Sequence, residues 1–375
     1  MNAPQIKGYC PGALRPMQSG DGIVVRIRPF NGRLRRAQAD GIATMAAAHG
    51  NGLIDLSSRG NLQIRGVKES TYAPLIEGLH HMALIDANEA AEARRNVLVT
   101  PFWQTGDETE TFTAALTDAL GAEDAPATPG KFGFAIDTGR APVLQSASAD
   151  IRLERDICGG LVLAADGAAT GKRVTSQTAI PDMLALADWF LEKRTTQTRM
   201  SHLLKDGLPL PPGFTVPRQT QNYVPAPGYT PFGTMVGLAF GQLQVKTLAS
   251  LAKHGGLRMT PWRMVLVESA RELPDVDGII TDPDDPLLRV IACSGAPACA
   301  QGLADTRAIA QNVAAFLKRD QLLHVSGCAK GCAHPRAASV TVTATKTGFD
   351  IIRDGKASDT PTQTNLISDE IIKAL

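Results

Sequence analysis

The sequence lacks the two glycine-rich motifs by which many enzymes bind nucleotides. No G-x-G-x-x-G follows an expected strand and opens a helix, and no P-loop occurs in the 375 residues. Neither motif therefore offers a site for a dinucleotide or a nucleoside triphosphate.

Long apolar runs and an excess of one charge are also missing. No apolar run approaches the 18 residues that indicate a membrane-spanning helix, and no charged-then-apolar signal segment is seen. We therefore expect a soluble, cytoplasmic protein that makes no membrane contact. The formal net charge of +1 argues against a general nucleic-acid binder.

The charge is nevertheless unevenly distributed along the chain. Residues 1–70 contain ten Lys and Arg against four Asp and Glu, whereas residues 101–130 contain six acidic residues and no Lys or Arg. A locally basic part favours an anionic small molecule over a polymer as the binding partner. The alternative is a basic face that is only solvated.

Four of the six cysteines lie within 40 residues, as Cys293-x5-Cys299 and Cys328-x3-Cys332. Each loop is too short to leave its two thiols far apart, so four thiolates are expected to converge on a metal. Zinc pairs usually have two or four intervening residues, whereas iron–sulfur clusters accept varied spacings. An iron–sulfur cluster is therefore favoured, and a structural zinc or unrelated buried cysteines are the alternatives.

The other two cysteines, Cys10 and Cys158, have no partner at ligand spacing. We expect both to be small buried side chains. Three disulfides are arithmetically possible, but a reducing compartment makes metal ligation the better reading of this cysteine usage.

Hydrophobic periodicity predicts a strand, helix, strand, strand unit near the start of the chain. The strands are expected at residues 23–28, 53–57 and 61–65, and the helix at residues 34–48, where His49 and the glycines after it end it.

A weaker copy of this unit occurs about 200 residues later, with strands at 234–240, 257–259 and 263–268 and a helix starting near Val245. Self-similarity at this distance implies two half-units that pack together.

Composition divides the chain into five parts. The first half-unit is expected at 1–75, a middle α/β domain at 76–204, a linker with seven prolines at 205–231, the second half-unit at 232–275, and an α/β domain with the cysteines at 285–375.

Each cysteine pair follows an expected strand of the last domain. Residues 287–292 lead to Cys293, and residues 322–326 lead to Cys328. Open α/β layers place their ligands at the carboxyl ends of strands, so this is where a cofactor is expected. The helix between the two strands is expected to bury Leu303, Ile309, Val313 and Phe316.

The cysteine spacing and its surroundings resemble the ferredoxin-dependent nitrite and sulfite reductase superfamily. Within it, the stretches ACSGAPAC and SGCAKGCAHP look most like the precorrin-3B synthase family. The resemblance implies an α+β fold in which two ferredoxin-like half-units, related by a pseudo-twofold axis, are joined by two α/β sulfite reductase-like domains. It also implies that Cys293, Cys299, Cys328 and Cys332 hold a [4Fe–4S] cluster.

Three basic residues match anion-binding motifs of the superfamily. The stretch SSRGNLQ puts Arg59 at an active-site arginine, RRNV puts Arg95 at a second, and PGKFG puts Lys131 at the first of two lysines. Guanidinium groups suit carboxylates because they donate two parallel hydrogen bonds. Each residue taken alone is as well explained as a surface charge.

Two departures bear on the reaction. Gly133 stands where sulfite reductases carry their second lysine, and Lys330 adds a cation where they usually have an asparagine. Both changes favour a site for an anionic tetrapyrrole that carries several carboxylates. The resemblance then implies a monooxygenase of cobalamin biosynthesis, which hydroxylates precorrin-3A with O₂ and forms a γ-lactone.

Two other functions stay open. One is a sulfite or nitrite reductase that binds sirohaem, in which Cys332 bridges the cluster and the haem iron. The other is a non-enzymatic binding module stabilised by zinc.

His334, next to the last cysteine, and His324 on the preceding strand are candidate ligands of a mononuclear non-haem iron that activates O₂. The alternative for His334 is a hydrogen-bond donor behind the metal loop. If NADH is the ultimate reductant, the absence of a nucleotide motif means that a separate flavoprotein or ferredoxin delivers the electrons.

Overall fold

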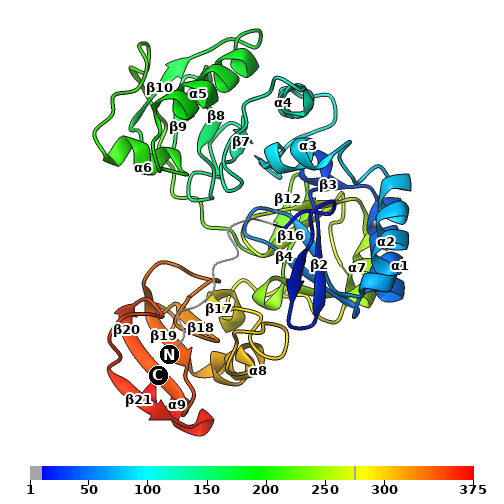
Figure 1. Ribbon diagram of the computed structural model, residues 1–375, viewed down its shortest axis with the longest axis vertical. Coiled ribbons are helices and arrows are strands. Elements are labelled where there is room, and N and C mark those ends of the chain that lie inside the picture. The colour runs from blue at the N-terminus through cyan, green and yellow to red at the C-terminus, as the bar shows by residue number, and fades with distance from the viewer. Residues whose placement is uncertain (1–10, 274–275) are drawn as a thin grey trace.

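The structure is a computed structural model that describes residues 11–273 and 276–375. Over these residues the fold is α+β, with four β-sheets and helices packed against them. The ribbon forms a central body and two further lobes, one above the other at its side (Figure 1). Cys10, and residue 275 at which the second half-unit was expected to end, lie outside the described residues.

The first half-unit is a five-stranded antiparallel sheet flanked by two helices. Its elements are β1 (Met17–Ser19), β2 (Gly22–Ile27), α1 (Arg36–His49), β4 (Leu53–Leu56), β5 (Leu62–Val67) and α2 (Glu69–His81), with β14 (Gln242–Gln244) added from the second half-unit. The strand order is β1-β2-β5-β4-β14. Helix α1 ends with Gly50 as its C-cap, which confirms the expected end of this helix.

The second half-unit repeats this arrangement and confirms the internal repeat. Its elements are β12 (Gly228–Thr230), β13 (Gly233–Gly237), α7 (Val245–His254), β15 (Leu257–Met259) and β16 (Met264–Glu268), with β3 (Arg33–Leu34) added from the first half-unit. The strand order is β12-β13-β16-β15-β3. Helices α1 and α7 pack against each other, and the two half-units share one hydrophobic core.

A left-handed turn in each repeat produces this exchange of strands. It is η1 (Phe30–Gly32) in the first half-unit and η2 (Ala239–Gly241) in the second, and the central residues Asn31 and Phe240 have φ of 55° and 58°. The turn directs the next residues away from their own sheet and onto the edge of the other. The expectation that Leu34 lies on a helix is therefore wrong, because Leu34 lies on the exchanged strand β3.

The middle domain forms the upper lobe in Figure 1 around a six-stranded sheet of order β11-β10-β9-β8-β7-β6. Strands β6, β7 and β8 are parallel. Its elements are α3 (Glu89–Arg94), β6 (Val97–Val99), α4 (Glu108–Gly121), β7 (Phe134–Asp137), β8 (Ile151–Arg155), β9 (Leu161–Ala165), β10 (Thr170–Arg173), α5 (Ala179–Lys193), α6 (Met200–Lys205) and β11 (Val216–Pro217).

The expected domain boundaries need correction where they cut an element. The boundary between residues 75 and 76 falls inside α2, and the boundary after residue 204 falls inside α6. The proline-rich segment 205–231 is not free of regular structure, because β11 pairs with β10 and β12 pairs with β13. Both strands lie at sheet edges, where a proline without an N–H group is tolerated.

The C-terminal domain forms the lower lobe around a sheet of order β17-β18-β19-β20-β21. Strands β17, β18 and β19 are parallel, and β20 and β21 run antiparallel to their neighbours. Its elements are η3 (Pro286–Arg289), β17 (Val290–Ala292), α8 (Thr306–Val313), η4 (Ala314–Phe316), β18 (Leu323–Ser326), β19 (Ala338–Ala344), β20 (Phe349–Gly355), β21 (Gln363–Leu366) and α9 (Ser368–Ala374).

Two details of the C-terminal domain differ from expectation. The first strand begins only at Val290, because the proline before it starts a 3-10 turn. Leu303 and Phe316 are 49% and 55% exposed, since they lie outside the eight-residue helix α8. Ile309 and Val313 do contact the core, as expected.

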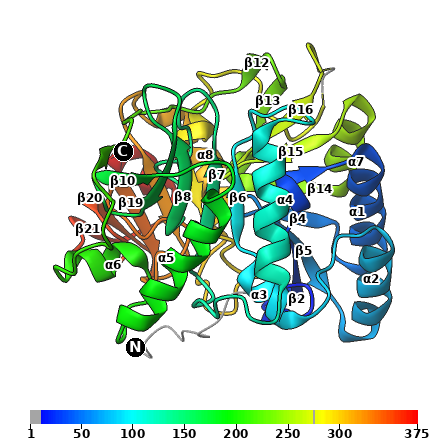
Figure 2. The same ribbon diagram turned by 90° about the horizontal axis from the view of Figure 1, so that it is seen from above.

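The helices of the two half-units and the last strands of the C-terminal domain lie on opposite sides of the molecule (Figure 2). Along the described ranges, none of the helices has the combination of length and apolar character needed to cross a membrane.

Candidate metal centre

Both cysteine pairs start at the same edge of the C-terminal sheet. Strands β17 and β18 are parallel neighbours, with Ala292 paired with Val325, so Cys293 and Cys328 leave the sheet side by side. This confirms the expected placement of both pairs beyond strand ends.

The other cysteines act electrostatically on Cys332. The Cys332 thiol is exposed, yet the surrounding protein raises its pKa, mainly by partial burial. Lys330 opposes this shift, and the three other cysteines add to it. The three other thiols therefore lie near enough to Cys332 to affect its ionisation.

The first cysteine loop is built for close approach of backbone to sulfur. The N–H of Gly327 donates to Cys293 Sγ at 3.2 Å, and Thr306 Oγ1 donates to the carbonyl of Cys293 at 2.7 Å. Gly295 has φ of 56°, and a Cβ there would lie 2.6 Å from the carbonyl oxygen of Ala304. Only glycine fits this turn.

The second loop turns as tightly. Ser326 Oγ donates to the carbonyl of Cys328 at 2.7 Å, and Gly331 has φ of 61°. Lys330 and Cys332 on this loop are exposed, so the loop presents a thiol and an ammonium group to solvent.

Four cysteines on two neighbouring loops are the kind of donor set that holds a four-iron cluster. In the described ranges, no group of three or more His, Cys, Asp and Glu side chains is placed to hold one metal ion. Four zinc–sulfur bonds would need all four sulfurs about 2.3 Å from one point. A [4Fe–4S] cluster puts each thiolate on a different iron, so its ligands stand further apart. Cys293, Cys299, Cys328 and Cys332 lie on two glycine-containing loops, and one backbone N–H group is directed at Cys293 Sγ, so the residues present are compatible with such a cluster.

A pair of histidines lies behind the second loop. His324 is fully buried on β18, neither ring nitrogen has a hydrogen-bond partner, and its ring lies 5.7 Å from that of His334. Burial first, then the nearby His334 and Arg263, lowers the pKa of His324 to about 4. A ring nitrogen of His334 lies 3.2 Å from the carbonyl oxygen of Ala337. No third ligand joins the pair among the described residues, so an iron at His334 stays a prediction.

Arg59 and Lys131 come together between the first half-unit and the middle domain. Arg59 Nη2 donates to the carbonyl of Lys131 at 2.6 Å and to Ser148 Oγ at 3.2 Å, and the Lys131 side chain is exposed. The turn that carries Arg59 is fixed by Ser57 Oγ, which accepts from the N–H groups of Arg59 and Asn61. The arrangement brings the Arg59 guanidinium to the backbone of Lys131, so that the two residues of the predicted substrate site are neighbours.

Arg95 is differently placed. Its guanidinium donates to both carboxylate oxygens of Asp86 at 2.5 and 2.7 Å and to the carbonyl of Arg28, and it lies over the Phe30 ring. Its exposed fraction is only 5%. The predicted contact between Arg95 and a substrate carboxylate is untested and would require Asp86 to release the guanidinium, so we expect Arg95 to act mainly on stability.

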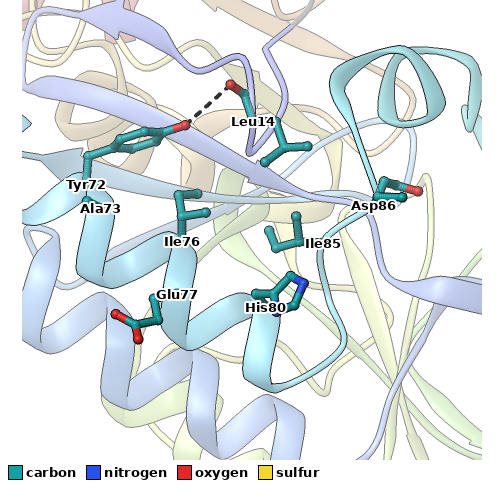
Figure 3. A pocket seen from close by; sticks show the side chains of 9 residues that line it. Leu14, Tyr72, Ala73, Ile76, Glu77, His80, Ile85 and Asp86 are labelled. Atoms are coloured by element: carbon teal, nitrogen blue, oxygen red, sulfur yellow. Dashed lines mark hydrogen bonds between the residues drawn. The ribbon is translucent and has the colours of Figure 1, made fainter.

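A cavity of about 460 Å³ lies beside α2 on the first half-unit. In Figure 3 the Tyr72 hydroxyl donates to the carbonyl of Leu14, and Ile76 and Ile85 form apolar walls. Glu77 and His80 line the same cavity. In Figure 1, α2 lies on the outer side of the first half-unit, away from β17 and β18, so this cavity is separate from the cysteine loops.

Sequence reasoning missed Arg65, which contacts the first cysteine loop from another domain. Its Nη2 donates to the carbonyl of Ala298 at 2.9 Å. No motif signals this contact, because the two residues meet only in the folded chain.

Comparison of the sequence with known proteins found a matching family and a similar protein. Residues 15–82 match the family of nitrite/sulfite reductase ferredoxin-like half domains. A precorrin-3B synthase from Sinorhizobium sp is 26% identical over 401 aligned residues, which cover 96% of this chain and 85% of the relative.

The solved structure of the Mycobacterium tuberculosis NirA protein superposes with a TM-score of 0.66 at 18% identity, over 94% of this chain and 79% of NirA. This likeness establishes the fold. Residues 15–82 thus match the nitrite/sulfite reductase ferredoxin-like half domain, and the chain over nearly its whole length is similar to a precorrin-3B synthase and shares the fold of NirA.

Proposed function

We propose that this chain is a monooxygenase like precorrin-3B synthase. It hydroxylates precorrin-3A with O₂, and a ring A acetate of the substrate closes a γ-lactone. The observation that carries the proposal is the pair of cysteine loops at one edge of β17 and β18, in a chain that aligns over 96% of its length with a protein named precorrin-3B synthase.

Cys293, Cys299, Cys328 and Cys332 would hold a [4Fe–4S] cluster, which supplies one-electron transfer when bound. Two electrons enter from a separate flavoprotein or ferredoxin. One atom of O₂ becomes the new hydroxyl, and the other leaves as water with two protons. The chain itself binds and orients the macrocycle and excludes water from it.

The substrate carries acetate and propionate arms, and three exposed or half-buried cations are suited to bind them. Arg59 and Lys131 approach one another between two domains, and Lys330 stands on the second cysteine loop. A guanidinium group that donates to a carboxylate forms a charge-assisted hydrogen bond, which is stronger than a neutral one.

A sirohaem-dependent sulfite or nitrite reductase is the second candidate, because the chain shares the fold of NirA. The site around Gly133 counts against it. A Cβ at position 133 would lie 2.9 Å from Asn96 Nδ2 and 3.1 Å from the Asn96 carbonyl oxygen, and the Gly133 N–H donates to Asp150. A side chain at the position of the second reductase lysine would thus require Asn96 to shift.

The test uses anaerobically purified full-length protein, precorrin-3A, a chemical or flavoprotein reductant and ¹⁸O-labelled dioxygen. Mass spectrometry is expected to find one labelled atom in the product and none from labelled water at that hydroxyl. Unlabelled product, or sulfite reduction at an enzymatic rate by the same preparation, would end the monooxygenase proposal. A Soret band in the visible spectrum would support the reductase.

A further inference from the structure

Three hydrogen bonds converge on the carbonyl of Ala298, one residue before Cys299 on the first cysteine loop. It accepts from Ser19 Oγ at 2.8 Å, from the Gly20 N–H at 3.2 Å and from Arg65 Nη2 at 2.9 Å. All three donors belong to the first half-unit, on the β1–β2 hairpin and on β5. Together they fix the backbone of the loop next to a predicted cluster ligand.

The hairpin fits this loop without spare room. A Cβ at Gly20 would lie 2.4 Å from the carbonyl oxygen of Pro297 and 2.9 Å from the Ala300 N–H nitrogen. The backbone of the hairpin therefore lies directly against the backbone of the loop on either side of Cys299.

Arg65 is held in place by two carboxylates. Asp21 accepts from Arg65 Nε at 3.0 Å and from Nη2 at 2.7 Å, and Asp55 lies 3.7 Å away. The exposed fraction of Arg65 is 6% and that of Asp55 is 8%. Charges this deeply buried are little screened by solvent or salt.

Asp55 extends the contact to the other end of the loop. It accepts from Arg307 Nη2 at 2.9 Å, and Arg307 lies on α8 next to Thr306, which binds the carbonyl of Cys293. Two ion pairs, Arg65–Asp55 and Asp55–Arg307, thus link the first half-unit to α8, whose first residue Thr306 binds the carbonyl of Cys293.

We infer that Arg65 is a positioning residue for the first pair of cluster ligands, and that Arg65 and Asp55 set the electrostatics of the cluster. This inference rests on the proposed function, since it needs the cluster. Reduction adds an electron, so a nearby positive charge favours the reduced form and a nearby negative charge disfavours it. Removal of Arg65 should lower the midpoint potential, and removal of the Asp55 charge should raise it.

The opposite signs separate this role from a merely structural one. Arg65→Gln is expected to lower the midpoint potential in a redox titration followed by EPR, and Asp55→Asn to raise it. Loss of partners behind metal ligands commonly weakens metal binding, so iron release from Arg65→Gln to a chelator is expected to be about tenfold faster. Arg65→Lys keeps the positive charge but loses the planar guanidinium group that donates to Asp21 and Ala298 at once. It should therefore speed iron release, while the midpoint potential stays near that of the wild type.

Arg258→Gln is the matched control, because Arg258 is an equally buried arginine that binds carbonyls of a different domain. It should leave the potential and the release rate of the cluster unchanged. If Arg65→Gln does not fold, Ser19→Ala removes one neutral donor to Ala298 and should still speed iron release at an unchanged potential.

Three results would overturn the inference: Arg65→Gln or Ser19→Ala with the release rate of the wild type, Arg65→Gln and Asp55→Asn with shifts of the same sign, or an equal effect of Arg258→Gln. A wild-type protein that binds no iron and sulfide would overturn the proposed function together with the inference. A wild-type protein with a normal cluster and insensitive variants would overturn the inference alone.

Discussion

Asp55 and Arg258 occupy equivalent positions in the two half-units and carry opposite charges. Asp55 on β4 pairs with Gln242 of the exchanged strand β14, and Arg258 on β15 pairs with Arg33 of the exchanged strand β3. Each forms an ion pair with the residue ten positions further on, Asp55 with Arg65 and Arg258 with Glu268. Both half-units therefore have an ion pair between these two positions, but the acidic residue comes first in one half-unit and the basic residue comes first in the other.

The arginines of the two ion pairs contact different domains. Arg65 donates to Ala298 in the C-terminal domain, whereas Arg258 donates to the carbonyls of Pro101 and Trp103, which lead into the middle domain. Each of the two half-units therefore contacts a different domain through a buried arginine.

Glu268→Ala should destabilise the protein markedly, because it leaves Arg258 buried without its carboxylate. We expect a loss of about 3–5 kcal/mol in the free energy of unfolding, the usual cost of breaking a buried ion pair. Denaturant unfolding monitored by circular dichroism measures it. Lys246→Ala, which breaks a largely exposed pair with Asp277, is the control and should cost under about 1 kcal/mol.

The sequence predicted three strands and one helix in each half-unit, because each of these elements carries its own periodic pattern. It did not predict helix α2 or the edge strands β1 and β12. The exchanged strands β3 and β14 were also not predicted, since two or three residues hold no pattern and their pairing is decided by the other half-unit. Similarly, the motif around Arg95 does not reveal that Asp86 occupies its guanidinium.

In the cysteine site, too, the local elements were predictable from the sequence and the contacts between distant segments were not. Strand ends and loop lengths sufficed to bring Cys293 and Cys328 to one edge of a sheet. The contact of Arg65 with Ala298 was not predictable, because it joins two domains that are far apart in the chain.

Replacement of Cys293 or Cys328 by serine should abolish the brown chromophore of anaerobically purified protein. Ligation and folding are coupled, so much of the C-terminal domain should also lose its protection in hydrogen exchange. Iron and acid-labile sulfide analysis, together with the visible spectrum, measures the loss. Cys158→Ser and Cys10→Ser should keep both, and retention of the full cluster signal by either ligand variant contradicts the assignment.

Arg59 and Arg95 should separate into a substrate residue and a structural residue. Arg59→Ala is expected to weaken substrate binding by about 1.5–3 kcal/mol, the range for a charged hydrogen bond, without a change in the cluster spectrum. Arg95→Ala leaves Asp86 buried without a partner, so its main effect should be a lower melting temperature. Binding by calorimetry and thermal unfolding compare the two variants, and identical behaviour would contradict the division.

Asp137 should make the stability of the middle domain depend on pH. Burial raises the pKa of Asp137 from 3.8 to about 7, and its Oδ1 has no hydrogen-bond partner, while Oδ2 accepts from the N–H groups of Val143 and Leu144. A carboxyl group with a raised pKa in the folded state stabilises the fold most below pH 3.8, and this contribution is lost as the pH rises to about 7.

Asp137→Asn keeps an oxygen for the two N–H groups and cannot ionise. The difference in melting temperature between the wild type and Asp137→Asn is therefore expected to change in favour of the variant as the pH rises from 4 to 7, and to level off above this range. Because every other titrating group is common to both proteins, the difference isolates Asp137. A difference that stays constant across this range would show that the carboxyl group is already ionised in the folded protein at pH 4.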